Sequence, residues 1–417
     1  MFLKNNILLF SAYIIFLLII YLLIKNYIIY PTIIPMTING GASLFADWTA
    51  ILNANACHEK GYDVFLENPC DHWKRIHLYG EILLYLPFIK DFPKFYFLFF
   101  PIIMNLLFLY VIVSSLFKYQ YKKKFFLFSF LVISVPILLV IERANIDIVI
   151  YIFMFLIAKY NNYILRYLLI ILSTLMKFYP ICLSIIFLFS KSLKKTSINL
   201  FIFFILIFGI LLLQLDSLIK IFDNQVEGSA SQFGVYEFSF LGFLNLLRFL
   251  NINIYGSNYN WIKYVYVVLF ILLPITLTYL FLSKKIYFKD LSKNLFNDDI
   301  FENRLYVLSS TVILICYFFF SNFIYREIFL LGLVPWVLLN EKKLENNSFL
   351  TFYFYTLFFK FILSSILVIA SANTALPKLL LITVKHTIDL YLMSLITYIF
   401  FLSILFFLKK SFDETNT

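Results

Sequence analysis

Long, nearly uninterrupted runs of apolar residues restrict what this 417-residue chain can fold into. The runs are about 11 to 26 residues long, and a helix needs roughly 20 residues to cross the hydrocarbon core of a bilayer, which is about 30 Å thick. Apolar residues make up 62% of the chain and charged residues only 14%, against roughly 25% charged in an average soluble domain. The sequence therefore excludes a soluble globular protein and predicts an all-α, polytopic membrane protein.

The runs predict a transmembrane bundle of about twelve helices. They lie at about 7–29, 92–117, 125–141, 146–158, 164–177, 180–190, 197–215, 262–283, 305–321, 327–340, 348–371 and 385–408. The first run is long enough to span and lacks a small-residue cleavage site after it, so we expect a retained anchor rather than a signal peptide. We expect one transmembrane domain over 1–410 and a short tail at 411–417.

Basic residues predict the orientation of the bundle. The chain has 34 Lys and Arg against 23 Asp and Glu, a net charge of +11. Basic residues hold membrane loops in the cytoplasm, so the surplus indicates topology and no nucleic acid partner is expected. Alternating the runs places the short lysine clusters inside, at 118–124, 159, 191–195, 284–304, 342–343 and 409–410. Both termini are then cytoplasmic, and the two large loops, 30–91 and 216–261, are extracytoplasmic.

Four runs between 125 and 190 are mostly too short to cross a bilayer and predict short hairpins. Two pairs of them meet at polar elbows, Glu142-Arg143-Ala144-Asn145 and Lys177-Phe178-Tyr179-Pro180. Irregular backbone at membrane depth is tolerated only where it is buried in protein or lines a wet cavity. The sequence therefore predicts an outward-facing cavity with the two elbows as its floor. The late apolar stretch 82–89 of the first loop is too short to span and is expected to lie in the interface as an amphipathic or re-entrant helix.

The cysteines of the first loop are candidates for a disulfide. Cys57 and Cys70 are thirteen positions apart, and closing a loop of that size contributes about 3 kcal/mol in the chain-entropy model. An oxidising periplasm permits such a bond. Cys182 and Cys316 lie in predicted helices and are expected to be free, buried thiols. Apart from one pair, the histidines lack the spacing of a metal site, and no metal is expected.

Asp47 is a candidate general base. It stands beside Trp48, shortly after the first apolar run. A carboxylate near the membrane surface, made more basic by partial burial, can take a proton from a substrate hydroxyl. The structural alternative is an acid at a helix N-terminus beside an interfacial tryptophan. The residues by themselves leave both interpretations open.

Charged residues at the elbows are candidates for binding an anion, because a charge between apolar runs is costly and often functional. Each has a structural alternative. Arg143 and Asp147 are four residues apart and suit a salt bridge on one helix face. Lys177 suits a lysine that snorkels to the interface, and Arg326 has Glu327 as a neighbouring partner. Together, three cations beneath an aspartate suit a lipid phosphate with a base above it.

Several segments of the chain form a series of motifs. They are Asp47-Trp48, Gly61-Tyr62-Asp63-Val64-Phe65, Asn68-Pro69-Cys70-Asp71, Glu142-Arg143-Ala144-Asn145-Ile146-Asp147, Leu175-Met176-Lys177-Phe178-Tyr179-Pro180 and Tyr325-Arg326-Glu327-Ile328-Phe329-Leu330-Leu331. In this order and spacing, they resemble the C-fold (GT-C) glycosyltransferases. The similarity is to the branch that uses polyprenyl-phosphate sugars, which includes the polyprenyl-phosphate-mannose mannosyltransferases, and it covers roughly residues 1–340. Where that family usually has Tyr-Pro-Pro, this chain has Tyr79-Gly80-Glu81, which makes Glu81 a second candidate base.

The resemblance implies a GT-C-like fold and an inverting transfer of a sugar. A hexose, mannose-like sugar or pentose would move from a polyprenyl-phosphate carrier to a lipid-linked or cell-envelope glycan on the extracytoplasmic face. Asp47 would be the general base, and no nucleotide, metal or other cofactor is implied. The implied substrate contacts are Arg143, Asn145, Lys177, Tyr179, Tyr325, Arg326 and Glu81. The partners would be the donor, the glycan or glycolipid acceptor and the bilayer. Abundant Phe, Ile, Asn and Lys are typical of an AT-rich bacterial genome, and so favour a bacterial plasma membrane.

Two other functions compete with the transferase. A transporter or flippase for a lipid-linked glycan would also have about twelve helices, but it should show two related halves with interrupted helices at matching positions. The sequence shows no such symmetry, and its irregular elbows all face outward. A polysaccharide polymerase or ligase would carry a large loop nearer the C-terminal half, whereas the largest polar outer loop here is the first. Both observations favour the transferase.

Overall fold

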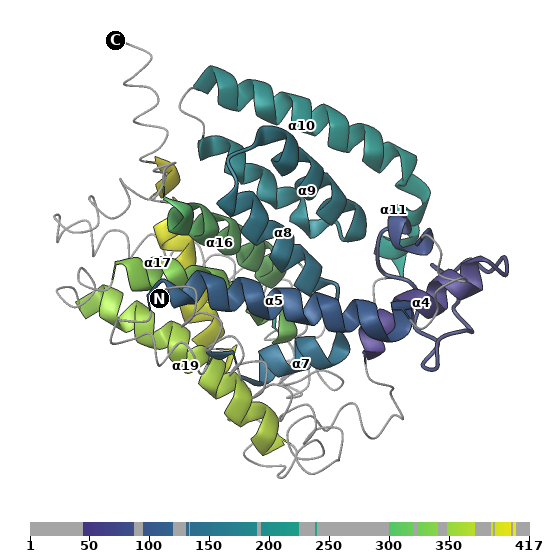
Figure 1. The fold of residues 1–417 in the computed structure, drawn as a ribbon, viewed down its shortest axis with the longest axis horizontal. Coiled ribbons are helices and arrows are strands. Elements are labelled where there is room, and N and C mark those ends of the chain that lie inside the picture. The colour runs from purple at the N-terminus through teal and green to yellow at the C-terminus, as the bar shows by residue number, and fades with distance from the viewer. Residues whose placement is uncertain are drawn as a thin grey trace, which may run out of the picture.

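The computed structural model describes residues 45–86, 95–119, 131–132, 134–189, 193–224, 238–239, 300–319, 324–340, 348–371, 385–386, 388–401 and 403–405. All the regular secondary structure in these residues is helical, and they contain no strand (Figure 1). Three helices among them are long and apolar enough to cross a membrane, Phe95–Leu116, Lys194–Leu213 and Ile388–Leu405. The all-α prediction is thereby confirmed. The count of about twelve spans stays a prediction, and the expected spans 7–29 and 262–283 lie outside the described residues.

Most of the expected runs coincide with helical elements to within a few residues. The elements are α4 Ala46–His58, η1 Glu81–Leu84, η2 Phe95–Phe99, α5 Phe100–Phe117, α7 Val135–Arg143, α8 Asp147–Lys159, α9 Tyr163–Met176, η3 Tyr179–Phe189, α10 Leu193–Leu213, α11 Leu215–Asp223, α16 Phe301–Phe319, η5 Ile324–Leu333, α17 Val334–Leu339 and α19 Ser348–Ser371. Here η1, η3 and η5 are 3-10 helices and η2 is a π-helix.

Two expected elements differ from the structure. The run at 125–141 is not one helix up to its end, because α7 begins only at Val135, after an extended Ser134 and with Pro136 in its first turn. Proline has no amide hydrogen and is therefore tolerated at the start of a helix. The helix expected at 82–89 is shorter in the described part of that stretch, residues 82–86. Residues Glu81–Leu84 form only a four-residue 3-10 helix.

The hairpin elements are short, as predicted. Elements α7, α8, α9 and η3 contain 9, 13, 14 and 11 residues. Their lengths are therefore roughly 14 to 22 Å, less than the hydrocarbon core of a bilayer. The elbow between α7 and α8, and the elbow between α9 and η3, join pairs of helices that are each shorter than this thickness.

Helix α16 lies at the centre of the molecule and brings the hairpins together. It packs against α8, η3, η5 and α17, while α5 packs on α8 and α10 packs on η3 (Figure 1). The contact with η5 is close, because a Cβ added to Gly332 would lie 1.9 Å from the Ser309 Oγ. Around this core, α5 and α10 expose large apolar side chains, including Phe201 at 67% and Phe208 at 63%. Water-exposed patches of this kind are rare on soluble proteins, and they suit contact with lipid.

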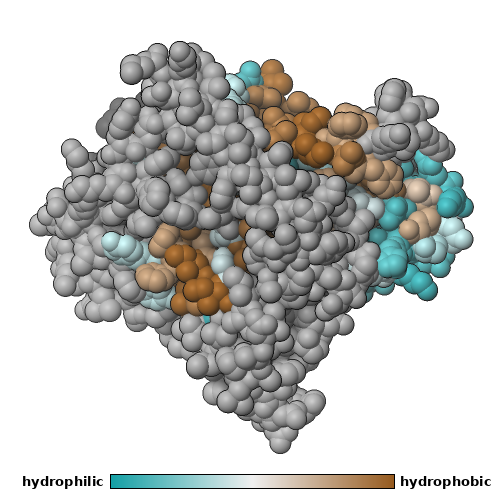
Figure 2. Space-filling view, turned by 60° about the horizontal axis from the view of Figure 1, so that its bottom comes forward, coloured by the Kyte–Doolittle hydropathy of each residue, from teal (hydrophilic) through white to brown (hydrophobic). Residues whose placement is uncertain are grey.

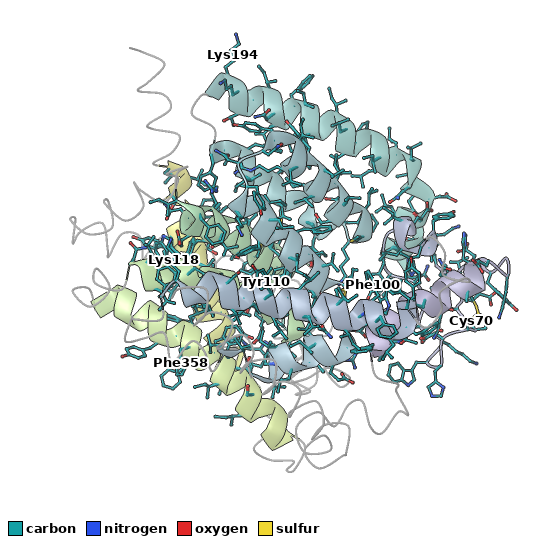
Figure 3. All side chains as sticks on the ribbon, in the orientation of Figure 1. Cys70, Phe100, Tyr110, Lys118, Lys194 and Phe358 are labelled. Carbon is teal, nitrogen blue, oxygen red and sulfur yellow. A yellow bond between two sulfur atoms is a disulfide. The ribbon has the colours of Figure 1, made fainter. Side chains whose placement is uncertain are left out.

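The two ends of the bundle differ in character. At one end, Lys118 at the end of α5 forms an ion pair of 2.7 Å with Glu302 of α16. Arg304 donates a hydrogen bond to the carbonyl of Ala158, near the end of α8. Figure 3 shows Lys118 and Lys194 toward this end and Cys70 at the opposite tip. In Figure 2 the hydrophilic residues gather at the tip, beside a band of apolar ones. The lysines expected inside thus lie away from the first loop.

Candidate active site

The start of α4 places Asp47 against the first elbow. Phe45 has a left-handed backbone (φ 64°, ψ 40°), and its N–H donates to the carbonyl of Glu142 at 3.0 Å. Asp47 follows in the first turn of α4. The next side chain, Trp48, is buried and donates from its indole Nε1 to the carbonyl of Tyr96 at 2.8 Å. These contacts fix the beginning of the helix on both sides of Asp47.

The first elbow is built by a left-handed residue and an asparagine. Ala144 has φ 46° and ψ 49°, and α7 ends at this residue. The N–H of Asn145 still donates to the carbonyl of Val140 at 3.2 Å. The side-chain Oδ1 of Asn145 accepts from the N–H of Asp147 at 3.0 Å, at the start of α8. Short polar side chains commonly satisfy helix-end amides in this way. The Nδ2 of Asn145 remains available to face Asp47.

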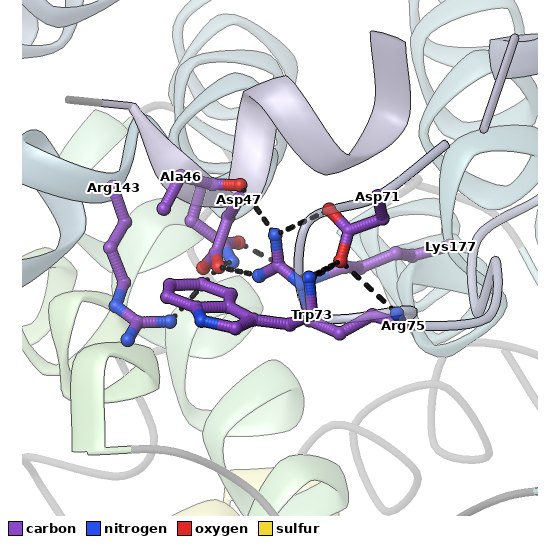
Figure 4. A network of polar contacts seen from close by, with 8 residues as sticks. Ala46, Asp47, Asp71, Trp73, Arg75, Arg143 and Lys177 are labelled. Atoms are coloured by element: carbon purple, nitrogen blue, oxygen red, sulfur yellow. Dashed lines mark hydrogen bonds and ion pairs between the residues drawn. The ribbon is translucent and has the colours of Figure 1, made fainter. Parts of the chain in front are cut away.

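Asp47 accepts hydrogen bonds from three side chains (Figure 4). Its Oδ1 lies 3.0 Å from a guanidinium nitrogen of Arg143 and 3.3 Å from one of Arg75. Its Oδ2 accepts from the Nδ2 of Asn145 at 2.8 Å. An ionised carboxylate offers about four acceptor sites. The described residues use three of them, which leaves one acceptor site on Oδ2 among the contacts of the described part of the chain.

Arg75 is the residue of this site that the sequence interpretation missed. Its Nε and Nη2 donate to the two oxygens of Asp71, each at 3.0 Å, and Nη2 also donates to the carbonyl of Ala46 at 2.9 Å. The ring of Trp73 covers its guanidinium at 4.4 Å. Burial raises the pKa of Asp71, but hydrogen bonds and charge from Arg75 outweigh it and hold that pKa below its usual 3.8. The Asp71–Arg75 spacing of four residues was the available sequence signal.

The second elbow brings Lys177 next to the polar side chains of the first elbow. Helix α9 ends at Met176, and Lys177 is extended, with φ −146° and ψ 147°. Its Nζ lies 2.5 Å from Asp147 Oδ1 and 3.3 Å from Asn145 Oδ1. Only 8% of its side chain is exposed, so Lys177 does not snorkel to the interface. The two predicted elbows therefore meet through their polar side chains.

Asp147 joins the second elbow to η5. The hydroxyl of Tyr179 donates to Asp147 Oδ1 at 2.8 Å, and the Nε of Arg326 lies 3.5 Å from Asp147 Oδ2. The guanidinium of Arg326 lies over the Tyr179 ring at 5.1 Å. The ion pairs expected as structural alternatives, Arg143 with Asp147 and Arg326 with Glu327, differ from the pairs that the structure shows. Arg143 reaches Asp47 rather than Asp147, and Glu327 forms an ion pair with Lys360.

Of the residues proposed from the sequence, six enter one continuous network: Asp47, Arg143, Asn145, Lys177, Tyr179 and Arg326. Tyr325 belongs to η5, but its side chain lies outside the described residues. Glu81 begins η1 and is half-buried, and its carboxylate makes no hydrogen bond or ion pair with another described residue. Its neighbour Gly80 donates from its N–H to the carbonyl of Met176 at 3.0 Å, directly before Lys177.

The disulfide lies on the loop side of this network. Cys57 and Cys70 are bonded, with their Cα atoms 5.7 Å apart, and the N–H of Cys70 donates to the sulfur of Cys57 at 3.1 Å. Asp71 follows Cys70 directly, so the bond ties the Asp71–Arg75 pair to the end of α4. Cys182 and Cys316 are free thiols. Within the described residues, no group of three or more His, Cys, Asp or Glu could hold a metal ion.

Comparison with known proteins adds no relative to this picture: no family model, no curated protein and no solved structure matches the chain. The chemistry of the network therefore carries the assignment of function.

Proposed function

We propose that this protein is a membrane glycosyltransferase that moves a sugar from a polyprenyl-phosphate carrier to a lipid-linked or cell-envelope glycan. The observation that carries the proposal is the single network that connects Asp47 with Arg143, Asn145, Lys177 and Arg326. These residues come from four separate segments of the chain, and together they place a carboxylate next to clustered cations. A C-fold glycosyltransferase would use such a pair for deprotonation and for leaving-group stabilisation. We place the protein in a bacterial plasma membrane, with this site on the extracytoplasmic face.

The Asp47 end of the network suits the acceptor. An acceptor hydroxyl would donate to the remaining acceptor site of Oδ2, opposite the hydrogen bond from Asn145. As the hydroxyl oxygen attacks the anomeric carbon, its proton passes to Asp47 and the bond between that carbon and the phosphate oxygen breaks. Attack from the face opposite the leaving group inverts the anomeric centre. Contacts from Arg75, Arg143 and Asn145 keep the carboxylate oriented for this step.

The Asp147 end suits the departing polyprenyl phosphate. Here two cations, Lys177 and Arg326, share one carboxylate. Ammonium and guanidinium groups stabilise a phosphate that gains charge as the sugar leaves, and their contribution is large in a site that excludes water. Asn145 connects the two ends, since its Nδ2 donates to Asp47 and its Oδ1 accepts from Lys177. The base and the phosphate site are therefore one side chain apart.

The test is sugar transfer in proteoliposomes, with a panel of polyprenyl-phosphate sugars, membrane acceptor lipids and mass spectrometry of the products. We expect Asp47→Asn to lower the rate by about 10²- to 10⁴-fold, the usual contribution of a general base. The matched control is Asp63→Asn. Asp63 is another acid of the same loop that pairs with Lys220 at 2.8 Å and lies outside the network. This variant should keep the wild-type rate.

Two outcomes would contradict the proposal. Transfer at the wild-type rate by a folded Asp47→Asn variant would move the base elsewhere, and Glu81→Gln would be the next variant. If no donor is consumed, but a lipid-linked glycan changes leaflet in the same vesicles, the protein is a transporter.

A further inference from the structure

A second group of charged side chains is buried behind η5. Apart from Glu327, which directly follows Arg326, its members lie far in sequence from the residues of the proposed site. Glu327, Lys360, Lys385 and Asp389 all have 0% exposed side chains. The Nζ of Lys360 lies 2.8 Å from Glu327 and also forms an ion pair with Asp389. Lys385 pairs with Asp389 at 3.0 Å. The hydroxyl of Ser364, one turn after Lys360 on α19, lies 3.2 and 3.0 Å from the two oxygens of Glu327.

Stability alone does not account for this cluster. Removing charged groups from water is costly, and replacing a buried ion pair by apolar residues of similar volume is often neutral or stabilising. Ionisable groups inside membrane segments are correspondingly associated with function. The cluster is also fully enclosed by protein, with the ring of Phe238 at 5.4 Å from the Lys360 Nζ. A substrate therefore cannot contact the cluster, and any effect of the cluster on the site has to pass through the protein.

The backbone that connects the cluster to the site is η5. Two consecutive residues of this 3-10 helix point into different networks: Arg326 reaches Asp147, and Glu327 reaches Lys360 and Ser364. Neighbouring residues of a 3-10 helix are about 120° apart around its axis, so the two ion pairs hold η5 from different sides. Contact with α16 holds it from another direction. The Glu327 pair is therefore one of the contacts that hold the segment carrying Arg326.

We propose that Lys360 is a positioning residue: through its ion pair with Glu327 it fixes η5, and so places Arg326 beside Asp147, where the polyprenyl phosphate departs. Asp389 pairs with the Lys360 ammonium, and Lys385 pairs with Asp389 in turn. The phosphate part of this statement rests on the proposed function, whereas the coupling between Lys360 and Arg326 is a property of the fold. It also makes the C-terminal helices part of the site, although the family resemblance ends near residue 340.

The coupling is tested by thermal unfolding of the full-length protein in detergent. Lys360→Met by itself leaves Glu327 buried without its ammonium partner and can prevent folding, so the informative background is Glu327→Gln/Lys360→Met, which removes both charges. Arg326→Met is measured in the wild type and in this background. We expect it to lower the melting temperature in the wild type and to have less than half that effect in the background, because η5 no longer holds Arg326 against Asp147. Equal losses in the two proteins would overturn the proposal.

The effect on the site is tested by transfer kinetics. We expect Glu327→Gln/Lys360→Met to raise the KM for the polyprenyl-phosphate sugar by about tenfold, with the KM for the acceptor unchanged. Lys360→Arg, which keeps the charge, should retain most of the donor affinity. Lys118→Met is the matched control, since it removes a lysine from the other end of the bundle. An unchanged donor KM in the double variant would overturn the proposal. If the wild type transfers no sugar, the proposed function fails, and the unfolding comparison still decides the coupling.

Discussion

At the scale of single residues, His77 of the first loop is a buried histidine. Its imidazole is 2% exposed and lies against the rings of Phe65 and Tyr79, at centroid distances of 5.5 and 5.6 Å. Its Nε2 is 3.4 Å from the carbonyl of Gly80. Burial disfavours the charged ring and lowers the pKa of His77 from the usual 6.5 to about 4. The folded loop therefore keeps His77 neutral in mild acid, where an unfolded chain would bind a proton.

This shift predicts an acid-sensitive loop. The contribution of neutral His77 to stability is fully present above the unfolded pKa of 6.5, and it is lost as the pH falls from there through about 4. Over the whole interval it corresponds to about 3 kcal/mol. We expect the melting temperature of the wild type to fall between about pH 7 and about pH 4.5, and His77→Phe to reduce that fall.

The control for this measurement is Asp71→Asn. The pKa of Asp71 is held below 3.8, so its contribution is lost only at more acidic pH, and this variant should keep the wild-type fall over the same interval. An equal fall in wild type and His77→Phe would contradict the assignment.

Among the elements, the joint between the first loop and α9 depends on the absence of a side chain. Gly80 has an ordinary extended backbone, with φ −66° and ψ 151°, so its conformation does not require glycine. The lack of space at this position does require glycine, because an added Cβ would lie 1.7 Å from the carbonyl oxygen of Leu175. The backbone of α9 cannot yield without moving Lys177, which follows two residues later. Gly80 thus lets the loop reach the second elbow.

We expect Gly80→Ala to separate the loop from this elbow and to lower stability by about 1–3 kcal/mol, the usual cost of overpacking. Sugar transfer should fall as well, because Lys177 lies next to the contact. Gly209→Ala on α10 is the control, since an added Cβ there meets nothing within 4 Å, and it should be neutral or slightly stabilising. Unfolding temperatures and transfer rates check both variants. Wild-type values for Gly80→Ala would show that the loop does not rest on α9.

For the whole molecule, the first loop and the lysine-bearing end of the bundle lie apart. We therefore predict that reagents reach them from opposite sides of the membrane. Glu67 is an exposed residue of the first loop, and Lys159 is an exposed residue at the end of α8. In a chain whose free thiols Cys182 and Cys316 are replaced by alanine, we introduce one cysteine at a time. We expect an impermeant maleimide to label Glu67→Cys in intact cells and Lys159→Cys only after the membrane is opened. Labelling of both from outside would overturn the predicted topology.

Much of the fold was predictable because the signals are local. The positions of the helices follow from the lengths of the apolar runs, and the run at 348–371 has the bounds of α19. The elbows follow from charged and proline residues that interrupt those runs. The helix expected at 82–89 is only partly described: Glu81–Leu84 form a short 3-10 helix whose Leu83 and Leu84 are buried by contacts that the sequence does not display, and its place in the interface stays a prediction.

The sequence by itself determined that the chain is helical, that its apolar runs suit a membrane and which residues at its elbows are chemically unusual, since composition and run length are properties of the chain. Only the tertiary structure decided which of these residues meet. Asp47 pairs with side chains 28, 96 and 98 positions away, and no spacing rule reaches that far. The same holds for Lys360, which stands inside an apolar run and gains its role only when α19 packs beside η5. A buried charge needs an opposite charge or a hydrogen bond at its position in the folded protein. The packing of the helices therefore decides which residue becomes its partner.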